Sequence, residues 1–391
     1  MSEKEVSIVI PARMGSTRLP GKPLKVIAGK PLVYWVIKAA LKVKKISKLI
    51  LASDHVEILK VASELGIESI LTSTVHKSGT ERLLEVAEKV NSDFFINLQG
   101  DEPLIEPADI EYLIEKLTKS NFDIVTLAHN IGLEDAKDPS KVKVISNYKN
   151  EAIYFSRNII PYGAISFKQH VGIYGFTKKS LKLIENFSET NLEKLESLEQ
   201  LRWLENNLKI GVFNSQFNSI GVDTIQDLKR VEKILMLRKL KILFSDVDGI
   251  LTDGKIWYGN NGEELKGFHS RDGLAIKLLM KNGIQFALIS ARDSRPLRKR
   301  ANDLGINHCI FGLEDKVEGC EEILSQLNID RSNAAYIGDD NIDIPAMDYC
   351  GISFTVSDAV KPVLAKANIV LKSKGGEGAI REVADMIFSA K

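Results

Sequence analysis

Short apolar runs of strand length recur along the chain, and each is followed by a segment whose apolar residues have helical spacing. The runs span residues Val6–Ile10, Leu49–Ala52, Phe94–Leu98, Ile242–Ser245, Phe286–Ser290 and Ala334–Gly338. This alternation is typical of parallel sheets covered by crossover helices. We therefore predict an α/β protein whose ligands bind where loops converge at the carboxyl ends of the strands.

The length of 391 residues predicts two domains, because a single hydrophobic core rarely grows to that size. A charged helical stretch, Gln226–Lys241, separates the motif Gly221–Thr224 from a fresh strand at Ile242. We place the boundary there and predict two doubly wound domains, residues 1–238 and 239–391. The short helical connection is expected to hold the domains at a fairly defined spacing.

The charge balance argues against nucleic acid or a membrane surface as a partner. Lysine and arginine number 53 and aspartate and glutamate 52, so the net charge of +1 supplies no long-range field for a polyanion. The three cysteines form no C-x-x-C pair, which favours a reduced cytoplasmic protein over a disulfide framework or a zinc site. The apolar stretch Val6–Ile10 is too short for a signal peptide or a membrane span.

The first strand ends in a loop, Pro11–Leu24, that combines glycines with three cationic side chains, those of Arg13, Arg18 and Lys22. Glycines let backbone N–H groups approach phosphates, and arginine and lysine neutralise them. Five residues separate Gly15 from Gly21 and a proline follows Lys22, so the loop is not a Walker A motif.

Together with later motifs, this loop resembles the sugar nucleotidyltransferases, specifically CMP-Kdo synthetase (3-deoxy-manno-octulosonate cytidylyltransferase; Kdo is the eight-carbon sugar acid). The resemblance spans about residues 5–232. The further motifs are His76–Arg82, Asn97–Ile105, Tyr154–Arg157, Ile160–Tyr162, His170–Tyr174, Leu198–Arg202 and Gly221–Thr224. It implies attack by the anomeric hydroxyl of a sugar acid on the α-phosphorus of CTP, which displaces pyrophosphate and gives a CMP-sugar.

The resemblance also implies roles for individual residues. Asp101 and Asp223 follow predicted strands and are expected to hold Mg²⁺ at the sheet edge. Those expected around the nucleotide are Arg13, Ser16, Lys22, Ser78, Arg82 and Gln99, with Lys22 also catalytic; those expected around the sugar acid are Arg157, His170, Tyr174, Glu196 and Gln200. The stretch between Tyr162 and His170 is shorter than in relatives, which leaves the identity of the sugar more open than the reaction.

The second half carries an Asp-x-Asp-Gly turn, Asp246–Gly249, directly after a buried strand. Two carboxylates this close repel each other unless a cation lies between them. Ser290 ends a later strand, Lys316 follows, and Asp339 comes after the strand Ala334–Gly338. This ordered set resembles the haloacid dehalogenase-like phosphatases without a cap domain, and residues 242–388 resemble the subgroup that contains Kdo-8-phosphate phosphatase.

This second resemblance implies that Asp246 attacks phosphorus to form an aspartyl-phosphate, while Asp248 donates and then accepts the proton. Mg²⁺ is expected at Asp246, Asp339 and the main-chain carbonyl of Asp248, with Ser290 and Lys316 on the phosphoryl oxygens. Two points stay open. Asp340 and Asp343 could both support the metal ligands, or Asp343 could simply cap the helix that follows. Arg271 either contacts the sugar acid or pairs locally with Asp272.

The hairpin-like stretch Lys255–Gly262 stands where a cap domain would be inserted. In relatives a homotetramer shields the site, with this hairpin and a glycine-rich tail reaching a neighbour, so we expect a homotetramer through the C-terminal domain. Glu377 in the tail stands where relatives often have arginine.

Three readings follow from these motifs. The first is a bifunctional enzyme that hydrolyses Kdo-8-phosphate and then activates Kdo with CTP. The second keeps the transferase and makes the C-terminal domain a silent oligomerisation module. The third is the same pair of reactions on a nine-carbon sialic-type acid. Retention of Asp246, Asp248 and Asp339 favours an active phosphatase over the silent module.

Overall fold

The computed structural model describes residues 4–15, 19–260 and 262–390, and it divides into two compact units. The N-terminal unit is Met1–Glu232 and the C-terminal unit is Lys233–Lys391. The division lies inside helix α9 (Ile225–Arg238), whereas the sequence analysis placed it after residue 238. None of the helices among the described residues is both long and apolar enough to cross a membrane.

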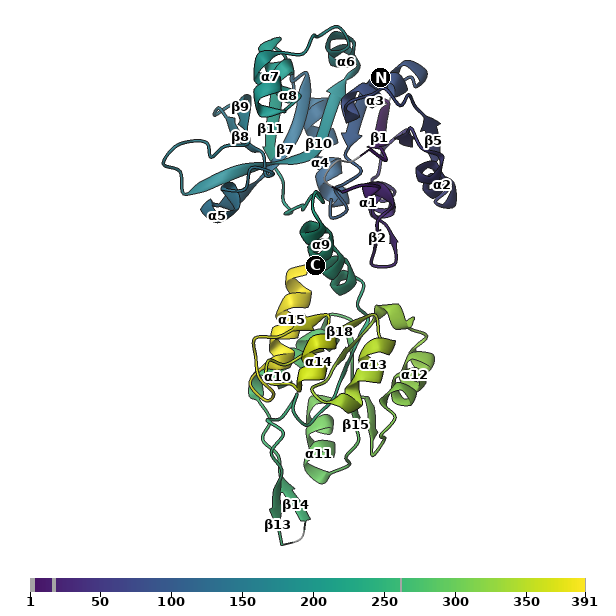
Figure 1. The fold of residues 1–391 in the computed structure, drawn as a ribbon, viewed down its shortest axis with the longest axis vertical. Helices are drawn as coiled ribbons and strands as arrows, with labels where there is room; N and C mark the ends of the chain where they lie inside the picture. Colours follow the sequence, from purple (N-terminus) through teal and green to yellow (C-terminus); the bar gives the residue numbers. More distant parts are fainter. Residues whose placement is uncertain (1–3, 16–18, 261, 391) are drawn as a thin grey trace. The chain divides into compact units, whose positions relative to one another are not determined.

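The N-terminal unit is built on a nine-stranded sheet with the order β11-β7-β10-β6-β1-β4-β5, to which β8 and β9 attach beside β10 (Figure 1). Its strands are β1 (Val6–Ala12), β4 (Lys48–Ser53), β5 (Glu68–Leu71), β6 (Phe94–Leu98), β7 (Ile124–Gly132), β8 (Lys143–Ser146), β9 (Ala152–Ser156), β10 (Ser166–Thr177) and β11 (Ile210–Asn214), with a small separate hairpin β2 (Val26–Ile27) and β3 (Lys30–Pro31). Its helices are α1 (Leu32–Ala40), α2 (Val56–Glu64), α3 (Gly79–Lys89), α4 (Pro107–Lys119), α5 (Leu133–Ala136), α6 (Lys178–Ile184), α7 (Asn191–Glu196) and α8 (Gln200–Glu205).

Strand β1 shows why this sheet forms. Ile8 and Ile10 pack into one hydrophobic cluster with α1, α2 and α4, whereas Val9 points to the other face and packs with α3, α6 and α8. All three are fully buried, as expected for a central strand covered on both faces. The neighbours β4 and β6 run parallel to β1, while β10 is antiparallel to β6. The predicted α/β fold is confirmed, with one antiparallel strand inserted into the parallel core.

The C-terminal unit has a six-stranded parallel sheet with the order β16-β15-β12-β17-β18-β19. Its strands are β12 (Ile242–Ser245), β15 (Gln285–Ser290), β16 (His308–Phe311), β17 (Ala334–Ile337), β18 (Ile352–Thr355) and β19 (Ile369–Val370), and its helices are α10 (Ser270–Lys281), α11 (Arg295–Leu304), α12 (Lys316–Leu327), α13 (Ile344–Tyr349), α14 (Lys361–Lys366) and α15 (Ala379–Ala390). Every residue of β12 is buried, so this strand forms the middle of the unit.

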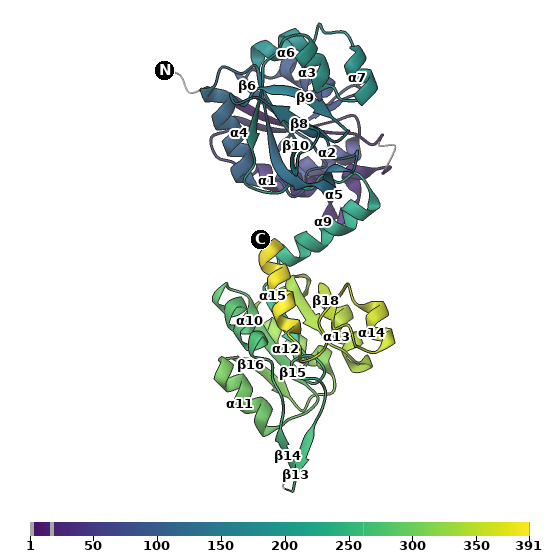
Figure 2. The ribbon, with the colours of Figure 1, turned by 90° about the vertical axis from the view of Figure 1, so that its left-hand side faces the viewer.

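A two-stranded hairpin, β13 (Trp257–Gly259) and β14 (Gly262–Leu265), projects from the body of the C-terminal unit (Figures 1 and 2). Its apolar side chains Trp257, Tyr258 and Leu265 are each more than half exposed. The predicted hairpin therefore forms, and the described residues between Thr252 and α10 contain no helix.

Two candidate active sites

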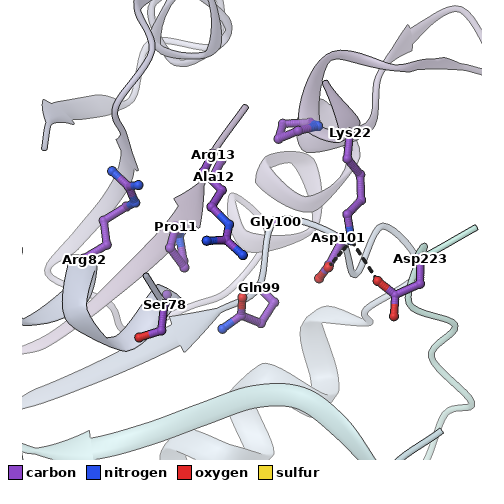
Figure 3. A pocket seen from close by; sticks show the side chains of 12 residues that line it. Pro11, Ala12, Arg13, Lys22, Ser78, Arg82, Gln99, Gly100, Asp101 and Asp223 are labelled. Atoms are coloured by element: carbon purple, nitrogen blue, oxygen red, sulfur yellow. Dashed lines mark hydrogen bonds and ion pairs between the residues drawn. The ribbon is translucent and has the colours of Figure 1, made fainter. Parts of the chain in front are cut away.

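The N-terminal unit has a cavity of about 280 Å³ at the carboxyl ends of β1 and β6 (Figure 3). The loop after β1 supplies Arg13 and Lys22, and the loop after β6 supplies Gln99 and Asp101. Seven of the predicted residues line it: Arg13, Lys22, Ser78, Arg82, Gln99, Asp101 and Asp223. The predicted Ser16 lies outside the described residues.

Lys22 lies between the two carboxylates of this cavity. Its Nζ atom is 2.7 Å from Oδ2 of Asp101 and 3.0 Å from Oδ1 of Asp223, and it also donates to the carbonyl oxygen of Val222. Burial lowers the pKa of Lys22, but the two carboxylates outweigh it and the net shift is upward. Asp101 and Asp223 therefore converge on one cation, which here is an ammonium group, and the same oxygens suit a divalent metal ion.

Two further residues of this cavity are held by helix α3. Ser78 caps the helix by accepting from the backbone N–H of Glu81, and its hydroxyl donates to Oε1 of Glu199 at 3.0 Å. Arg82 is almost fully buried and forms an ion pair with Asp54 at 3.1 Å. Its guanidinium is thus fixed at the cavity wall before any ligand binds.

Sequence reasoning missed Glu199. Burial raises the pKa of this carboxyl group, against hydrogen bonds from Thr80 and Ser78 and the charge of Arg202. The residue belongs to the motif Leu198–Arg202, so the available signal was its place directly before Gln200 and three residues before an arginine. A carboxylate beside Ser78 places a hydrogen-bond acceptor next to the predicted nucleotide site.

A second cavity, of about 500 Å³, shares Asp101 and Asp223 with the first. His170 lines it and lies 3.0 Å from Oγ1 of Thr126 through Nε2. Burial, and then the neighbouring His129, lower the pKa of His170 to about 3, so this imidazole is neutral at physiological pH. A neutral imidazole suits hydrogen bonding to a sugar hydroxyl better than charge pairing with a carboxylate.

The other residues predicted to bind the sugar acid do not line the two cavities. Arg157, Tyr174, Glu196 and Gln200 are absent from the described linings of both cavities. The guanidinium of Arg157 donates to the carbonyl oxygens of Pro139, Glu196 and Ser197. The Glu196 carboxylate accepts from the Ser156 hydroxyl and from the Arg157 backbone N–H. Arg157 and Glu196 thus join neighbouring loops to one another.

Glu102 is a further buried carboxyl group between the cavities. Its oxygens accept from the Ser219 hydroxyl at 2.6 Å and the Gly172 N–H at 3.1 Å. Burial, and then the charge of Asp101, raise its pKa to about 7. Since Glu102 ties the loop after β6 to β10 and to the segment before Asp223, it supports the position of both converging carboxylates.

The C-terminal unit gathers its predicted residues at the carboxyl edge of its sheet. Asp246 follows β12, Ser290 ends β15, Lys316 begins α12 and Asp339 follows β17. Lys316 is buried and lies 3.0 Å from Asp246 and 2.6 Å from Asp343. Burial lowers the pKa of Lys316, but these two carboxylates outweigh it and the net shift is upward.

Three carboxylates of this site, Asp246, Asp339 and Asp343, offer oxygens within 4.8 Å of one another. Burial and the nearby carboxylates raise the pKa of Asp246 and of Asp339 to about 7. Asp339 Oδ1 is buried and has no hydrogen-bond partner among the residues that the structure describes. An unsatisfied oxygen beside two like charges fits a divalent cation, which would lower both pKa values.

Asp343 takes the supporting role, and among the described residues its side chain makes no cap hydrogen bond to α13. Its Oδ1 accepts from Lys316 and from the Tyr336 hydroxyl, and its Oδ2 accepts from the backbone N–H groups of Asp339 and Asp340. It is fully buried. Because these donors already surround its oxygens, Asp343 supports Lys316 and the loop of Asp339.

Asp248 has a partner that the sequence analysis did not assign a role. Lys266 donates from Nζ to both carboxylate oxygens of Asp248 at 2.8 Å, and the side chain of Lys266 is fully buried. Thr252 also donates to Asp248 Oδ1. Arg271 is exposed in the first turn of α10, and Asp272 accepts from the backbone N–H of Arg381.

Glycines allow the loops of this site to approach one another. Gly249 has φ +85°, and a Cβ there would overlap the Asp339 carboxylate. A Cβ at Gly375 would overlap the carbonyl oxygen of Gly249, and Gly376 donates to the carbonyl oxygen of Ile250. The glycine-rich tail therefore packs against the Asp246–Gly249 turn of its own chain. The expected reach of this tail toward a neighbouring chain stays a prediction.

Comparison with known proteins agrees with this geometry. Residues 7–210, just over half of the chain, match the family model described as cytidylyltransferase. The chain belongs to the cytidylyltransferase family. A 3-deoxy-manno-octulosonate cytidylyltransferase of Fusobacterium nucleatum subsp. nucleatum is 44% identical over 242 residues, which cover 60% of this chain and 98% of the relative. A second relative, from Acidobacterium capsulatum, is 38% identical over 244 residues, which cover 61% of this chain and all of the relative.

Among solved structures, a CMP:2-keto-3-deoxy-manno-octonic acid synthetase complexed with CTP is 40% identical to this cytidylyltransferase-family chain, with a TM-score of 0.57. The match covers 59% of this chain and 98% of the chain in that structure. Residues 312–383 match the family model described as haloacid dehalogenase-like hydrolase. A cobalt-bound deoxy-D-mannose-octulosonate 8-phosphate phosphatase of Haemophilus influenzae is 46% identical, with a TM-score of 0.39, and covers 40% of this chain and 91% of its own. The family models thus confirm the predicted pairing of a cytidylyltransferase with a haloacid dehalogenase-like unit.

Proposed function

We propose that the N-terminal unit transfers CMP from CTP to Kdo and releases pyrophosphate. The supporting observation is the convergence of Asp101 and Asp223 on one cation, beside the cationic loop after β1. The names of the relatives, cytidylyltransferases acting on 3-deoxy-manno-octulosonate, support the choice of substrates.

In this reaction the anomeric oxygen of the sugar forms a bond to the α-phosphorus of CTP. The bond from that phosphorus to the bridging oxygen breaks, pyrophosphate leaves, and the hydroxyl proton passes to solvent. Arg13 and Lys22 neutralise the charge of the phosphates, and Arg82 is fixed in place beside them. When bound at Asp101 and Asp223, Mg²⁺ would supply further charge neutralisation on the phosphate oxygens.

For the C-terminal unit the proposal is hydrolysis of Kdo-8-phosphate to Kdo and phosphate. The supporting observation is that Asp246, Lys316 and Asp339 come from three separate segments into one buried cluster. A module that served only for oligomerisation would gain nothing from burying these charges, because burial of unneeded carboxylates costs stability.

The hydrolysis has two steps. Asp246 forms a bond to phosphorus while the bond to the sugar oxygen breaks, and Asp248 gives that oxygen a proton. Water then attacks the aspartyl-phosphate, the bond to Asp246 breaks, and Asp248 takes a proton from the water. Ser290 and Lys316 hold the phosphoryl oxygens. Mg²⁺ at Asp246, Asp339 and the Asp248 carbonyl would neutralise those oxygens.

The experiment is phosphate release from Kdo-8-phosphate with Mg²⁺ and without CTP, together with CMP-Kdo formation from Kdo and CTP. We expect the intact chain to perform both reactions. Asp246→Asn should lose only phosphate release, and Asp101→Asn should lose only CMP-Kdo formation. CMP-Kdo formation without any phosphate release by the intact chain would leave the C-terminal unit silent on this substrate, and a nine-carbon sugar acid with its 9-phosphate would be tested next.

A homotetramer through the C-terminal unit is part of the proposal. It is supported by the hairpin β13–β14, whose apolar side chains Trp257, Tyr258 and Leu265 are exposed. Exposed apolar side chains on a projecting arm are typical of a docking element. Light scattering of the intact chain and of a Trp257→Ser/Leu265→Ser variant measures this directly, because the variant should dissociate.

A further inference from the structure

The strongest unexplained feature of the C-terminal unit is the pairing of Lys266 with Asp248. The Lys266 side chain is fully buried, directly after the last residue of β14, and its ammonium group lies 2.8 Å from both carboxylate oxygens of Asp248. A buried lysine with a two-oxygen contact costs desolvation and side-chain entropy, so it needs a compensating role.

We propose that Lys266 is the positioning residue of the proton donor in the phosphatase reaction. This inference rests on the proposed phosphatase function and deepens it. Asp248 must reach the sugar oxygen as the bond between that oxygen and phosphorus breaks, and its carboxyl group can rotate about χ2 unless it is held. The Lys266 ammonium donates to both carboxylate oxygens, and the Thr252 hydroxyl donates to Oδ1 from the same turn. When one oxygen of Asp248 carries the proton, the other can still accept from Lys266.

The proposal predicts a dependence on the leaving group. In the first step the bond from phosphorus to the leaving oxygen breaks and the bond to Asp246 forms. A sugar alkoxide needs the proton of Asp248, whereas p-nitrophenolate is a weak base and leaves without it. The value of kcat/KM includes only the steps up to departure of the leaving group. Misplacing Asp248 should therefore lower kcat/KM for Kdo-8-phosphate and leave that for p-nitrophenyl phosphate little changed.

The test uses the intact chain with Mg²⁺ and compares Lys266→Met with wild type on both substrates. We expect kcat/KM for Kdo-8-phosphate to fall about 10²-fold, the lower end of what a positioned general acid contributes. With p-nitrophenyl phosphate we expect a burst of one nitrophenolate per site, because water attack on the aspartyl-phosphate also needs Asp248. In an Asp248→Asn background, Lys266→Met should add no further selective loss.

The matched control is Lys255→Met, since Lys255 precedes the same hairpin and forms an exposed ion pair with Asp253. This variant should keep the wild-type kcat/KM for both substrates. Should Lys266→Met fail to fold, Lys266→Gln is tested instead, because glutamine keeps an uncharged amide NH₂ donor and should give the same selectivity to a smaller degree. An equal fall of kcat/KM on the two substrates, or no fall, would overturn the inference. If wild type hydrolyses neither substrate, the proposed phosphatase function itself is refuted.

Discussion

Replacement of Gly249 by alanine separates the two proposed activities of this chain. Gly249 has φ +85°, where an alanine costs roughly 1–2 kcal/mol. Its Cβ would also stand 2.8 Å from Oδ1 of Asp339 and closer to Oδ2, so the carboxylate must move. Ordinary contact distances are about 3.5 Å or more, so Oδ2 must shift by more than about 1 Å, and a displacement of about 1 Å already costs about 10²-fold in rate. We therefore expect phosphatase activity to fall at least that far.

Gly254→Ala is the matched control, because Gly254 lies in the same loop with φ +78° and its Cβ would meet nothing closer than 3.8 Å. The two variants should have similar melting temperatures, since both carry the backbone strain. Phosphate release is measured beside CMP-Kdo formation on the same sample, and CMP-Kdo formation should stay at the wild-type level in both. Equal phosphatase rates in the two variants would refute the overlap with Asp339 as the cause.

Three further expectations follow from the contacts. The pKa of His170 is about 3 in the folded state and 6.5 in the unfolded state, so the unfolded state binds the proton first and stability falls with acidification below pH 6.5. Between pH 7.5 and 5.5 the free energy of unfolding of the wild type should therefore fall by about 1.3 kcal/mol. Urea denaturation of His170→Gln should not show this loss. Arg157→Lys should lower the free energy of unfolding by about 1–3 kcal/mol in the same assay, because a lysine cannot donate to three separated carbonyl oxygens. If Arg157 served only in substrate binding, the substitution would raise KM and leave stability unchanged. Asp343→Asn should destabilise the chain by about 3–5 kcal/mol and abolish phosphate release, because Lys316 and the Tyr336 hydroxyl then lose a buried carboxylate partner. Wild-type unfolding and activity would contradict the supporting role of Asp343.

The sequence predicted the fold because the central strands of both sheets are short runs that are buried on both faces. Such runs stand out as continuous apolar segments, and all six predicted runs form strands. The residues directly after these strands were also predictable as neighbours, since parallel strands end at one edge of a sheet. Asp101, Asp246 and Asp339 each follow a predicted strand, and the family resemblance then supplied the roles expected of them and of Asp223.

Contacts between side chains and distant backbone could not be predicted in this way. Nothing in the spacing of Arg157 and Glu196 indicates that the arginine donates to the carbonyl oxygen of that glutamate, because the contact depends on how two loops pack. The same holds for Lys266, whose partner Asp248 lies 18 residues earlier on another loop. A motif shows that a charged residue is present, whereas the tertiary structure decides which group neutralises it.

Both units neutralise clustered carboxylates with a lysine, but the two lysines leave different oxygens available to a metal ion. Each brings carboxylates together at a sheet edge and places a lysine between two of them: the half-buried Lys22 between Asp101 and Asp223, and the buried Lys316 between Asp246 and Asp343. In the N-terminal unit the ammonium contacts both proposed metal ligands, so a divalent cation must compete with Lys22 for their oxygens. In the C-terminal unit the lysine leaves Asp339 Oδ1 unpartnered among the described residues, so a cation can bind there without displacing Lys316. Under the proposed functions, a metal ion at Asp101 and Asp223 would release Lys22 toward the phosphates of the nucleotide, whereas Lys316 would keep its contacts with Asp246 and Asp343 while a phosphoryl group binds.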